Sequence, residues 1–145
     1  LMNIVHRFAQ LDSVKLHSFT SSTVKGLSAA RTVTFSVASN NHITKFHLEN
    51  MLDVDQVHFL LQLCPRLRYL RIGCIGTVDV ECVVQGVLNK LAAGGNERLS
   101  FVSLGAPAVD DATMEDLRTL LTVNGRSRRW TIQQRSKEIC LCRKE

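Results

Sequence analysis

The chain has 145 residues, of which 45% are hydrophobic and 21% are charged, with two prolines and eight glycines. This composition is that of one folded domain, and it excludes a low-complexity or disordered chain. The formal net charge of +5 is concentrated near the end, because residues 118–145 hold 8 Lys and Arg against 2 Asp and Glu. Such an asymmetry is compatible with an acidic partner or a nucleic acid, although a solvated basic surface is the simpler interpretation.

No stretch of the sequence predicts a membrane span or a secretory signal. The opening "LMNIVHRFAQ" is amphipathic and has no charged start followed by an apolar run. The longest apolar stretch, around "VHFLLQLC", is far shorter than the roughly 20 residues that a bilayer requires. Five cysteines and no Asn-x-Ser/Thr acceptor favour a reducing compartment, so we expect a cytoplasmic or nuclear, intracellular protein.

One short pattern, with apolar residues at its first, fourth and sixth positions, occurs five times. The copies are "LDSVKL" (11–16), "ARTVTF" (30–35), "ITKFHL" (43–48), "LRYLRI" (67–72) and "LSFVSL" (99–104). Their starts are separated by 19, 13, 24 and 32 residues, so the spacing is uneven. Each copy predicts a strand whose apolar residues face a common core.

The segments between these strands predict loops in the first half and helices in the second. "MNIVHRFAQ" (2–10) is helix-like, whereas residues 19–29 and 36–42 are polar and predict loops. Helical periodicity follows an Asp or Thr cap in three later segments: "DVDQVHFLLQLC" (53–64), "TVDVECVVQGVLNKLAAGG" (77–95) and "VDDATMEDLRTLLTVNG" (109–125). Gly94 and Gly125 are expected to end the last two helices.

The alternation of strands and helices predicts an α/β fold. Short connections favour parallel strands, because each helix can serve as the crossover. Together with the repeated triplets, this predicts a leucine-rich-repeat-like solenoid that spans residues 1–145 as a single domain. Residues 126–145 alternate apolar and polar around Trp130/Ile132 and Ile139/Leu141, which predicts a C-terminal β-hairpin that caps the stack.

Two segments carry a resemblance to a known family. "LCPRLRYLRIG" (63–73) resembles the leucine-rich repeats of F-box proteins, in which Cys-Pro precedes an apolar triplet. The closing "MEDLRTLLTVNGRSRRWTIQQRSKEICLCRKE" (114–145) is similar to the tail of some invertebrate F-box-like repeat proteins. The resemblance implies a substrate receptor of a cullin-type ubiquitin ligase. The F-box motif itself is not present in this chain, so a contact with the ligase adaptor would need residues upstream of Leu1.

The residues between the inward triplets are expected to form a ladder on the other side of the strands. Adjacent strands lie about 4.8 Å apart, so Tyr69 and Phe101 should be neighbours. Aromatic and arginine side chains dominate the centres of protein interfaces. We therefore predict a protein-binding surface made of Lys45, His47, Tyr69, Arg71, Phe101 and Ser103. The alternative is that Phe101 turns under a helix and that the arginines are only a solvated surface.

A second hypothesis is a nucleic-acid-binding module in the basic C-terminal segment. Its residues would be Arg126, Arg128, Arg129, Arg135, Lys137, Arg143 and Lys144, with Trp130 as a stacking surface. This hypothesis requires the basic side chains to converge on one face. We regard it as the less favoured of the two.

No motif predicts catalysis, a metal or a cofactor. "GLSAA" (26–30) only loosely resembles a nucleophile elbow around Ser28, and the five histidines include no HExxH. Cys140 and Cys142 lack a second pair at zinc-finger spacing, so we interpret them as small buried hydrophobes. The acidic residues of 110–116 fit the capping of a helix. The sequence therefore predicts a non-catalytic scaffold without a cofactor, which binds a protein and not a membrane.

Overall fold

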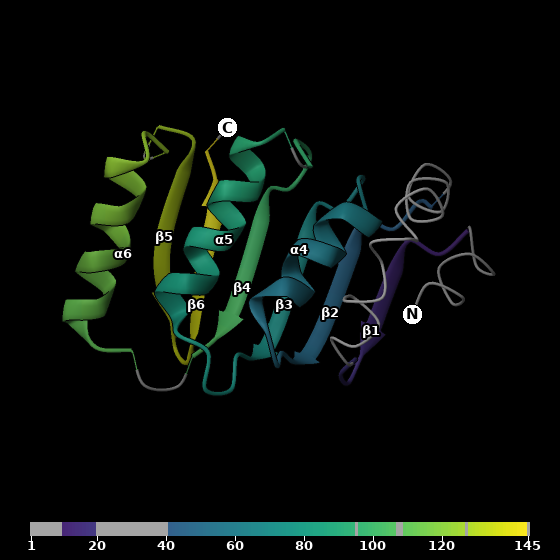
Figure 1. Cartoon of the computed structure of the whole chain (residues 1–145), viewed down its shortest axis with the longest axis horizontal. Helices are drawn as coiled ribbons and strands as arrows, with labels where there is room; N and C mark the ends of the chain where they lie inside the picture. The colour runs from purple at the N-terminus through teal and green to yellow at the C-terminus, as the bar shows by residue number, and fades with distance from the viewer. Residues whose placement is uncertain (1–9, 20–40, 95, 107–108, 127, 145) are drawn as a thin grey trace.

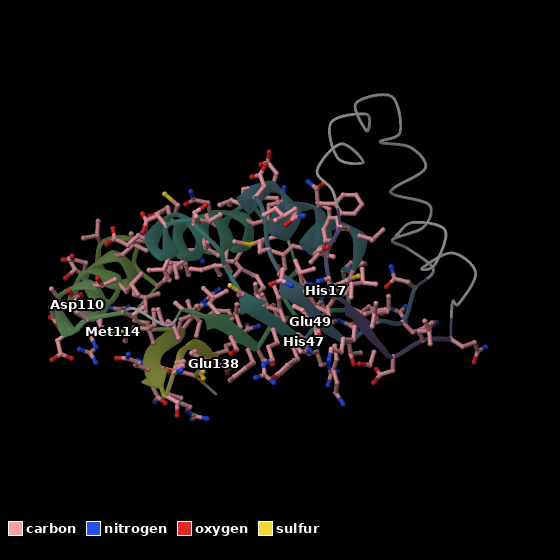
Figure 2. All side chains as sticks on the ribbon, turned by 90° about the horizontal axis from the view of Figure 1, so that it is seen from below. His17, His47, Glu49, Asp110, Met114 and Glu138 are labelled. Carbon is pink, nitrogen blue, oxygen red and sulfur yellow. The ribbon has the colours of Figure 1, made fainter. Side chains whose placement is uncertain are left out.

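The computed structural model describes residues 10–19, 41–94, 96–106, 109–126 and 128–144. The elements of this part are β1 (Ser13–Leu16), β2 (Lys45–Asn50), α4 (Val54–Leu63), β3 (Tyr69–Cys74), α5 (Val80–Ala92), β4 (Phe101–Gly105), α6 (Asp111–Val123), β5 (Trp130–Arg135) and β6 (Glu138–Arg143). The strands form one sheet in the order β1-β2-β3-β4-β6-β5. Figures 1 and 2 show α4, α5 and α6 together over one face of this sheet.

Strands β1 to β4 are parallel and in register. Val14 pairs with Phe46, which pairs with Leu70, which pairs with Val102, and all four side chains are buried. The apolar positions of these copies therefore face the helices, as the alternation of side chains along a strand requires. The predicted copy at 30–35, the helix at 2–10 and nearly all of the loops at 19–29 and 36–42 lie outside the described residues, as does Ser28.

The predicted leucine-rich-repeat solenoid is wrong. β6 pairs antiparallel with both β4 and β5 and lies between them, so the strands form one mixed six-stranded sheet with three described helices. The apolar triplets indicate which side of a strand is buried, but they do not indicate that equal units continue to stack. Residues 130–143 do form a hairpin, yet it extends the sheet instead of covering the end of a stack.

The antiparallel pairing has a physical cause at β4. The outer edge of β4 has backbone N–H and C=O groups that need partners, and its Val102 and Leu104 face the core. Leu141 pairs with Val102, and Ile139 pairs with Leu104. All four side chains are buried on the same side of the sheet, so the hairpin completes the hydrogen bonds of β4 and enlarges the core in one step.

Each helix begins at an acidic cap. Asp53, Asp79 and Asp110 accept hydrogen bonds from backbone N–H groups in the first turns of α4, α5 and α6. These residues were among the caps that the sequence predicts. Gly94 and Gly125 follow the ends of α5 and α6 with φ of +78° and +65°, as expected for glycines that terminate helices. In the described part of the chain, no helix is both long and apolar enough to cross a membrane.

Candidate functional site

The face of the sheet opposite the helices, which we call the open face, has no described helix over it (Figure 2). Its side chains form three rows that run across the strands. The register places Ser13, Lys45, Tyr69, Phe101, Cys142 and Thr131 in the first row. It places Lys15, His47, Arg71, Ser103, Cys140 and Gln133 in the second. The third contains His17, Glu49, Gly73, Gly105, Glu138 and Arg135.

An aromatic pair occupies the middle of the first row. The rings of Tyr69 and Phe101 stack with their centroids 4.7 Å apart and their planes at 4°. Both side chains are partly exposed. The predicted contact between these residues is confirmed, and the alternative that Phe101 turns under a helix is wrong. Because each ring covers one face of the other, the pair presents mainly its edges to a partner.

Glu138 joins the second and third rows. Its Oε1 accepts a hydrogen bond from Nη2 of Arg71, and its Oε2 accepts one from Oγ of Ser103 at 2.7 Å. The hydrogen bond from Ser103 and the ion pair with Arg71 hold the pKa of Glu138 below its ordinary value, although partial burial acts in the opposite direction. Glu138 in turn raises the pKa of Arg71.

This arrangement corrects one predicted site residue. Ser103 has an exposed fraction of 0%, because its row neighbours are Arg71 and Cys140 and its hydroxyl is bound to Glu138. It therefore cannot touch a partner and instead positions Glu138. Sequence reasoning missed Glu138, because the residue lies in a segment that reads only as a polar turn. Its role depends on the register of β6 against β4, which no local signal indicates.

A second charged cluster lies on β1 and β2 at the other side of the open face. Glu49 binds Nζ of Lys15 at 2.7 Å and Nδ1 of His17 at 2.8 Å. Hydrogen bonds from Lys15 and His17 lower the pKa of Glu49 to about 2. Figure 2 shows His17, His47 and Glu49 on the same side of the sheet as Glu138.

The charges of the open face are therefore largely compensated. Burial, followed by the positive charges of Lys15 and Arg71, lowers the pKa of His47, which favours its neutral form. Among the predicted partner-binding residues, Lys45 is the one cation with no ion pair to any described residue. The surface that remains for a partner consists of the aromatic pair with Lys45 beside it and His47 behind it.

The residues of the nucleic-acid hypothesis do not all lie together, although Arg126, Arg129, Trp130 and Arg143 border one pocket. Trp130 has an exposed fraction of 5%, so it offers no stacking surface. Arg128 and Arg129 precede β5, whereas Arg135 and Lys137 lie at its other end, a separation of roughly 20 Å for a six-residue strand. The hypothesis requires all of the basic side chains on one face, whereas β5 separates Arg128 and Arg129 from Arg135 and Lys137, and alternation places Trp130 on the buried side with Ile132.

Neither a metal-binding cluster among the described residues nor a similar known protein indicates the function of the chain. Within the described residues, no group of three or more His, Cys, Asp or Glu side chains could hold a metal ion. Comparisons with protein-family models, with curated proteins and with solved structures find no match to this chain. The F-box resemblance therefore remains a prediction from residues 63–73 and 114–145.

Proposed function

We propose that this chain is a non-catalytic protein-interaction scaffold that binds its partner on the open face. The observation that carries the proposal is the stacked pair of Tyr69 and Phe101 on the adjacent strands β3 and β4. Large aromatic side chains at the centre of a surface supply much of the energy of protein interfaces. Because stacking fixes both rings, little side-chain entropy is lost when a partner covers them.

The charges around the pair favour a particular kind of partner. Glu49 and Glu138 are both occupied by ion pairs, whereas Lys45, next to Tyr69, has no described ionic partner. A partner segment with an apolar side chain beside an Asp or Glu would cover the rings and pair with Lys45. Such complementarity determines register and specificity more than affinity.

The same geometry disfavours a nucleic acid at this site. Single-stranded nucleic acids stack their bases on free aromatic faces. Here one face of each ring, that of Tyr69 and that of Phe101, is already covered by the other ring. A base could not insert between the two rings without breaking this stack, whereas an apolar protein side chain can pack on the pair as it stands.

Within this proposal, the narrower role of a substrate receptor for an F-box-type ubiquitin ligase rests on the resemblance alone. A cytoplasmic or nuclear location is supported by the five cysteines, which form no disulfide with one another. The narrower role is tested by whether the protein co-purifies with the cullin adaptor. If the two proteins do not co-purify, the ubiquitin-ligase role is refuted, but the proposal of a docking surface on the open face still stands.

The docking surface is tested by comparing captured proteins quantitatively between variants. The double variant Tyr69→Ala/Phe101→Ala should capture at least about tenfold less of a protein that binds the wild-type chain. Val123→Ala is the matched control, because Val123 is an apolar residue on α6 with an exposed fraction of 79%. Lys45→Glu changes an exposed residue, so it should weaken binding of the same protein without affecting the core.

Thermal unfolding monitored by circular dichroism checks that each variant is folded. Equal capture by the wild type and by both open-face variants would refute the docking surface. So would the capture of RNA in place of a protein, with dependence on Tyr69 and Phe101.

A further inference from the structure

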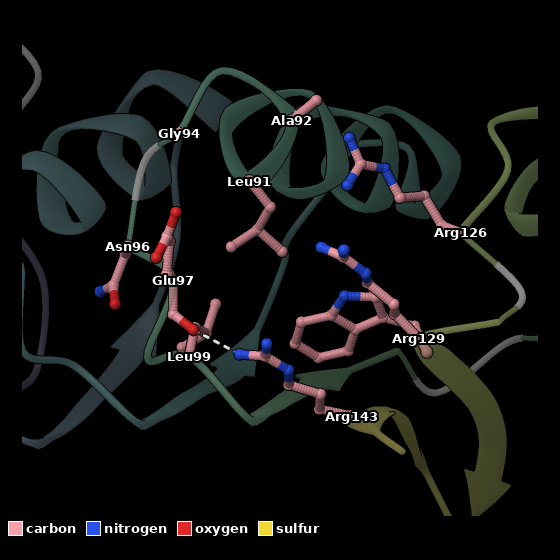
Figure 3. Close-up of a pocket in the computed structure, with 10 residues that line it drawn as sticks. Leu91, Ala92, Gly94, Asn96, Glu97, Leu99, Arg126, Arg129 and Arg143 are labelled. Carbon is pink, nitrogen blue, oxygen red and sulfur yellow. Dashed lines mark hydrogen bonds between the residues drawn. The ribbon is translucent and has the colours of Figure 1, made fainter. Parts of the chain in front are cut away.

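A cavity of about 400 Å³ lies on the helix side of the sheet, away from Tyr69 and Phe101 (Figure 3). It is bounded by the end of α5, by residues 96–99 before β4, and by the start of β5 and the end of β6. Trp130, Leu99 and Asn96 are buried and form its floor, whereas Glu97 and the arginines around it are more exposed. We call this cavity the arginine pocket.

Three guanidinium groups converge on the arginine pocket. Figure 3 shows Arg126, Arg129 and Arg143 reaching into it from the side of β5 and β6, opposite Leu91 and Glu97. Nη1 of Arg143 donates a hydrogen bond to the carbonyl oxygen of Glu97. The guanidinium groups of Arg126 and Arg129 have no ion pair or hydrogen bond with any described residue. With one carboxylate among its lining residues, the pocket has a net charge of +2.

A neutral donor lies in the same pocket. Trp130 lines the cavity with an exposed fraction of 5%, and its indole N–H makes no hydrogen bond to a described residue. In this pocket it is left to water or to a ligand, and it would add a neutral donor to the three cationic ones.

Backbone hydrogen bonds fix the places from which two of the arginines project. The N–H of Arg126 donates to the carbonyl of Leu121 at 2.8 Å. The N–H groups of Arg129 and Trp130 both donate to the carbonyl of Arg126 at 2.9 Å. This turn anchors Arg126 to the end of α6 and fixes the positions from which Arg126 and Arg129 project.

We propose that the arginine pocket binds the phosphate group of a small phosphate monoester. The net charge of +2 matches a phosphate dianion, and guanidinium groups bind phosphate oxygens with paired, charge-assisted hydrogen bonds. The volume lies in the usual range for small-molecule sites, and the partly exposed, apolar Leu91 suits the organic part of the ligand. Glu97 at the rim disfavours an extended polyanion.

The test uses Trp130 itself, because it is the one tryptophan in the sequence. Phenyl phosphate is titrated into the protein, tryptophan fluorescence is recorded, and calorimetry provides a second readout. We expect a saturable signal with a dissociation constant of about 1 mM or tighter. Phenol, which lacks the phosphate, and potassium chloride at equal ionic strength should give no saturable change. Inorganic phosphate should compete with phenyl phosphate.

Variants assign the binding to the pocket. Arg126→Gln and Arg129→Gln should each weaken binding of phenyl phosphate about tenfold, because each removes a charge-assisted contact. Arg128→Gln is the matched control, because Arg128 belongs to the same turn and is exposed but does not line the pocket. Having two independent pocket variants keeps the test informative if one of them unfolds.

Three results would overturn the proposal. The first is the absence of a saturable signal with phenyl phosphate in the wild-type chain. The second is an equal loss of binding in Arg128→Gln, which would indicate only diffuse charge attraction. The third is tight, steeply salt-dependent binding of single-stranded RNA that is also lost in Arg135→Gln, which would assign the basic side chains to a nucleic acid.

Discussion

At the scale of the residue, Glu138 determines how much charge the open face offers. It neutralises Arg71 and leaves Ser103 buried, so two of the six residues predicted from the sequence as partner contacts are engaged within the protein. Lys45, His47, Tyr69 and Phe101 remain as the accessible group. A partner that bound Arg71 would first have to displace Glu138, and breaking that ion pair would reduce the binding free energy.

This role predicts a pH-dependent contribution to stability. The pKa of Glu138 is lower in the folded chain than its ordinary value of 4.5, so its stabilisation is complete above that value and is lost as the pH falls through the folded pKa. Glu138→Gln should lower the free energy of unfolding by about 1 kcal/mol near neutral pH, and the difference should shrink in acid. Urea denaturation at several pH values measures both effects.

The control for this prediction is Glu115→Gln. Glu115 pairs with Arg118 across one turn of α6, and both side chains are mostly exposed. Exposed pairs of this kind contribute little, so this substitution should change the free energy of unfolding only slightly. A difference between wild type and Glu138→Gln that is the same in acid as at neutral pH would argue against the role of the Glu138 carboxylate.

Alternation along strands explains which single residues could be predicted from the sequence. Tyr69 and Phe101 occupy the same position in two apolar triplets, and parallel strands in register bring such positions together. The same rule already places Trp130 on the side of buried Ile132, so its proposed role in stacking conflicted with its own pattern. The burial of Ser103 could not be predicted, because it depends on a side chain from β6.

At the scale of the element, the sequence indicated the helix caps and the parallel pairing of β1 to β4, but not the pairing of β6. The helix caps at Asp53, Asp79 and Asp110 depend on hydrogen bonds within a few residues, so the sequence contains the necessary information. The partner of β6 depends on which strand edge is free in the assembled sheet. A hairpin that covers the end of a stack and a hairpin that inserts one strand beside β4 have the same alternating pattern.

The ends of β3 and β4 approach each other closely enough to require glycine. A Cβ atom at Gly105 would lie 1.8 Å from the carbonyl oxygen of Gly73, which is a backbone atom and cannot swing away. Gly105→Ala should therefore lower the free energy of unfolding by about 3 kcal/mol, as overpacking in a tight site does. Chemical denaturation gives the measurement.

Gly94→Ala separates this steric effect from the general cost of replacing a glycine. Gly94 has a positive φ of 78°, but a Cβ there would meet no atom within 4 Å. The cost should be that of a left-handed backbone alone, about 1 kcal/mol. If Gly105→Ala and Gly94→Ala lower the free energy of unfolding equally, the backbone at the close approach of β3 and β4 relaxes easily.

At the scale of the whole molecule, the mixed sheet makes the hairpin part of the core. Leu141 of β6 is fully buried between its partners Val102 of β4 and Ile132 of β5. In a stack of repeats, a terminal unit contacts only its neighbour and can fray independently. In one sheet with an inserted strand, loss of the hairpin exposes the apolar side of β4 and should unfold the chain as a unit.

Leu141→Ala tests this view. It should lower the free energy of unfolding by about 3 kcal/mol, and the fluorescence of Trp130 and the far-ultraviolet circular dichroism should still change at the same urea concentration. Gln133→Ala, at an exposed position of the neighbouring strand, should stay within about 0.5 kcal/mol of the wild type. A fluorescence transition at lower urea than the dichroism transition would identify the hairpin as a separate unit.

The strand order also constrains how the chain can acquire its structure during synthesis. β5 leaves the ribosome before β6, but the place next to β4 belongs to β6. The nascent β5 therefore has no site to occupy in the growing sheet, and the edge of β4 stays unprotected until the following strand emerges and folds back. Translation must proceed through Arg143, the end of β6, before β5 and β6 can pair with each other and with the sheet.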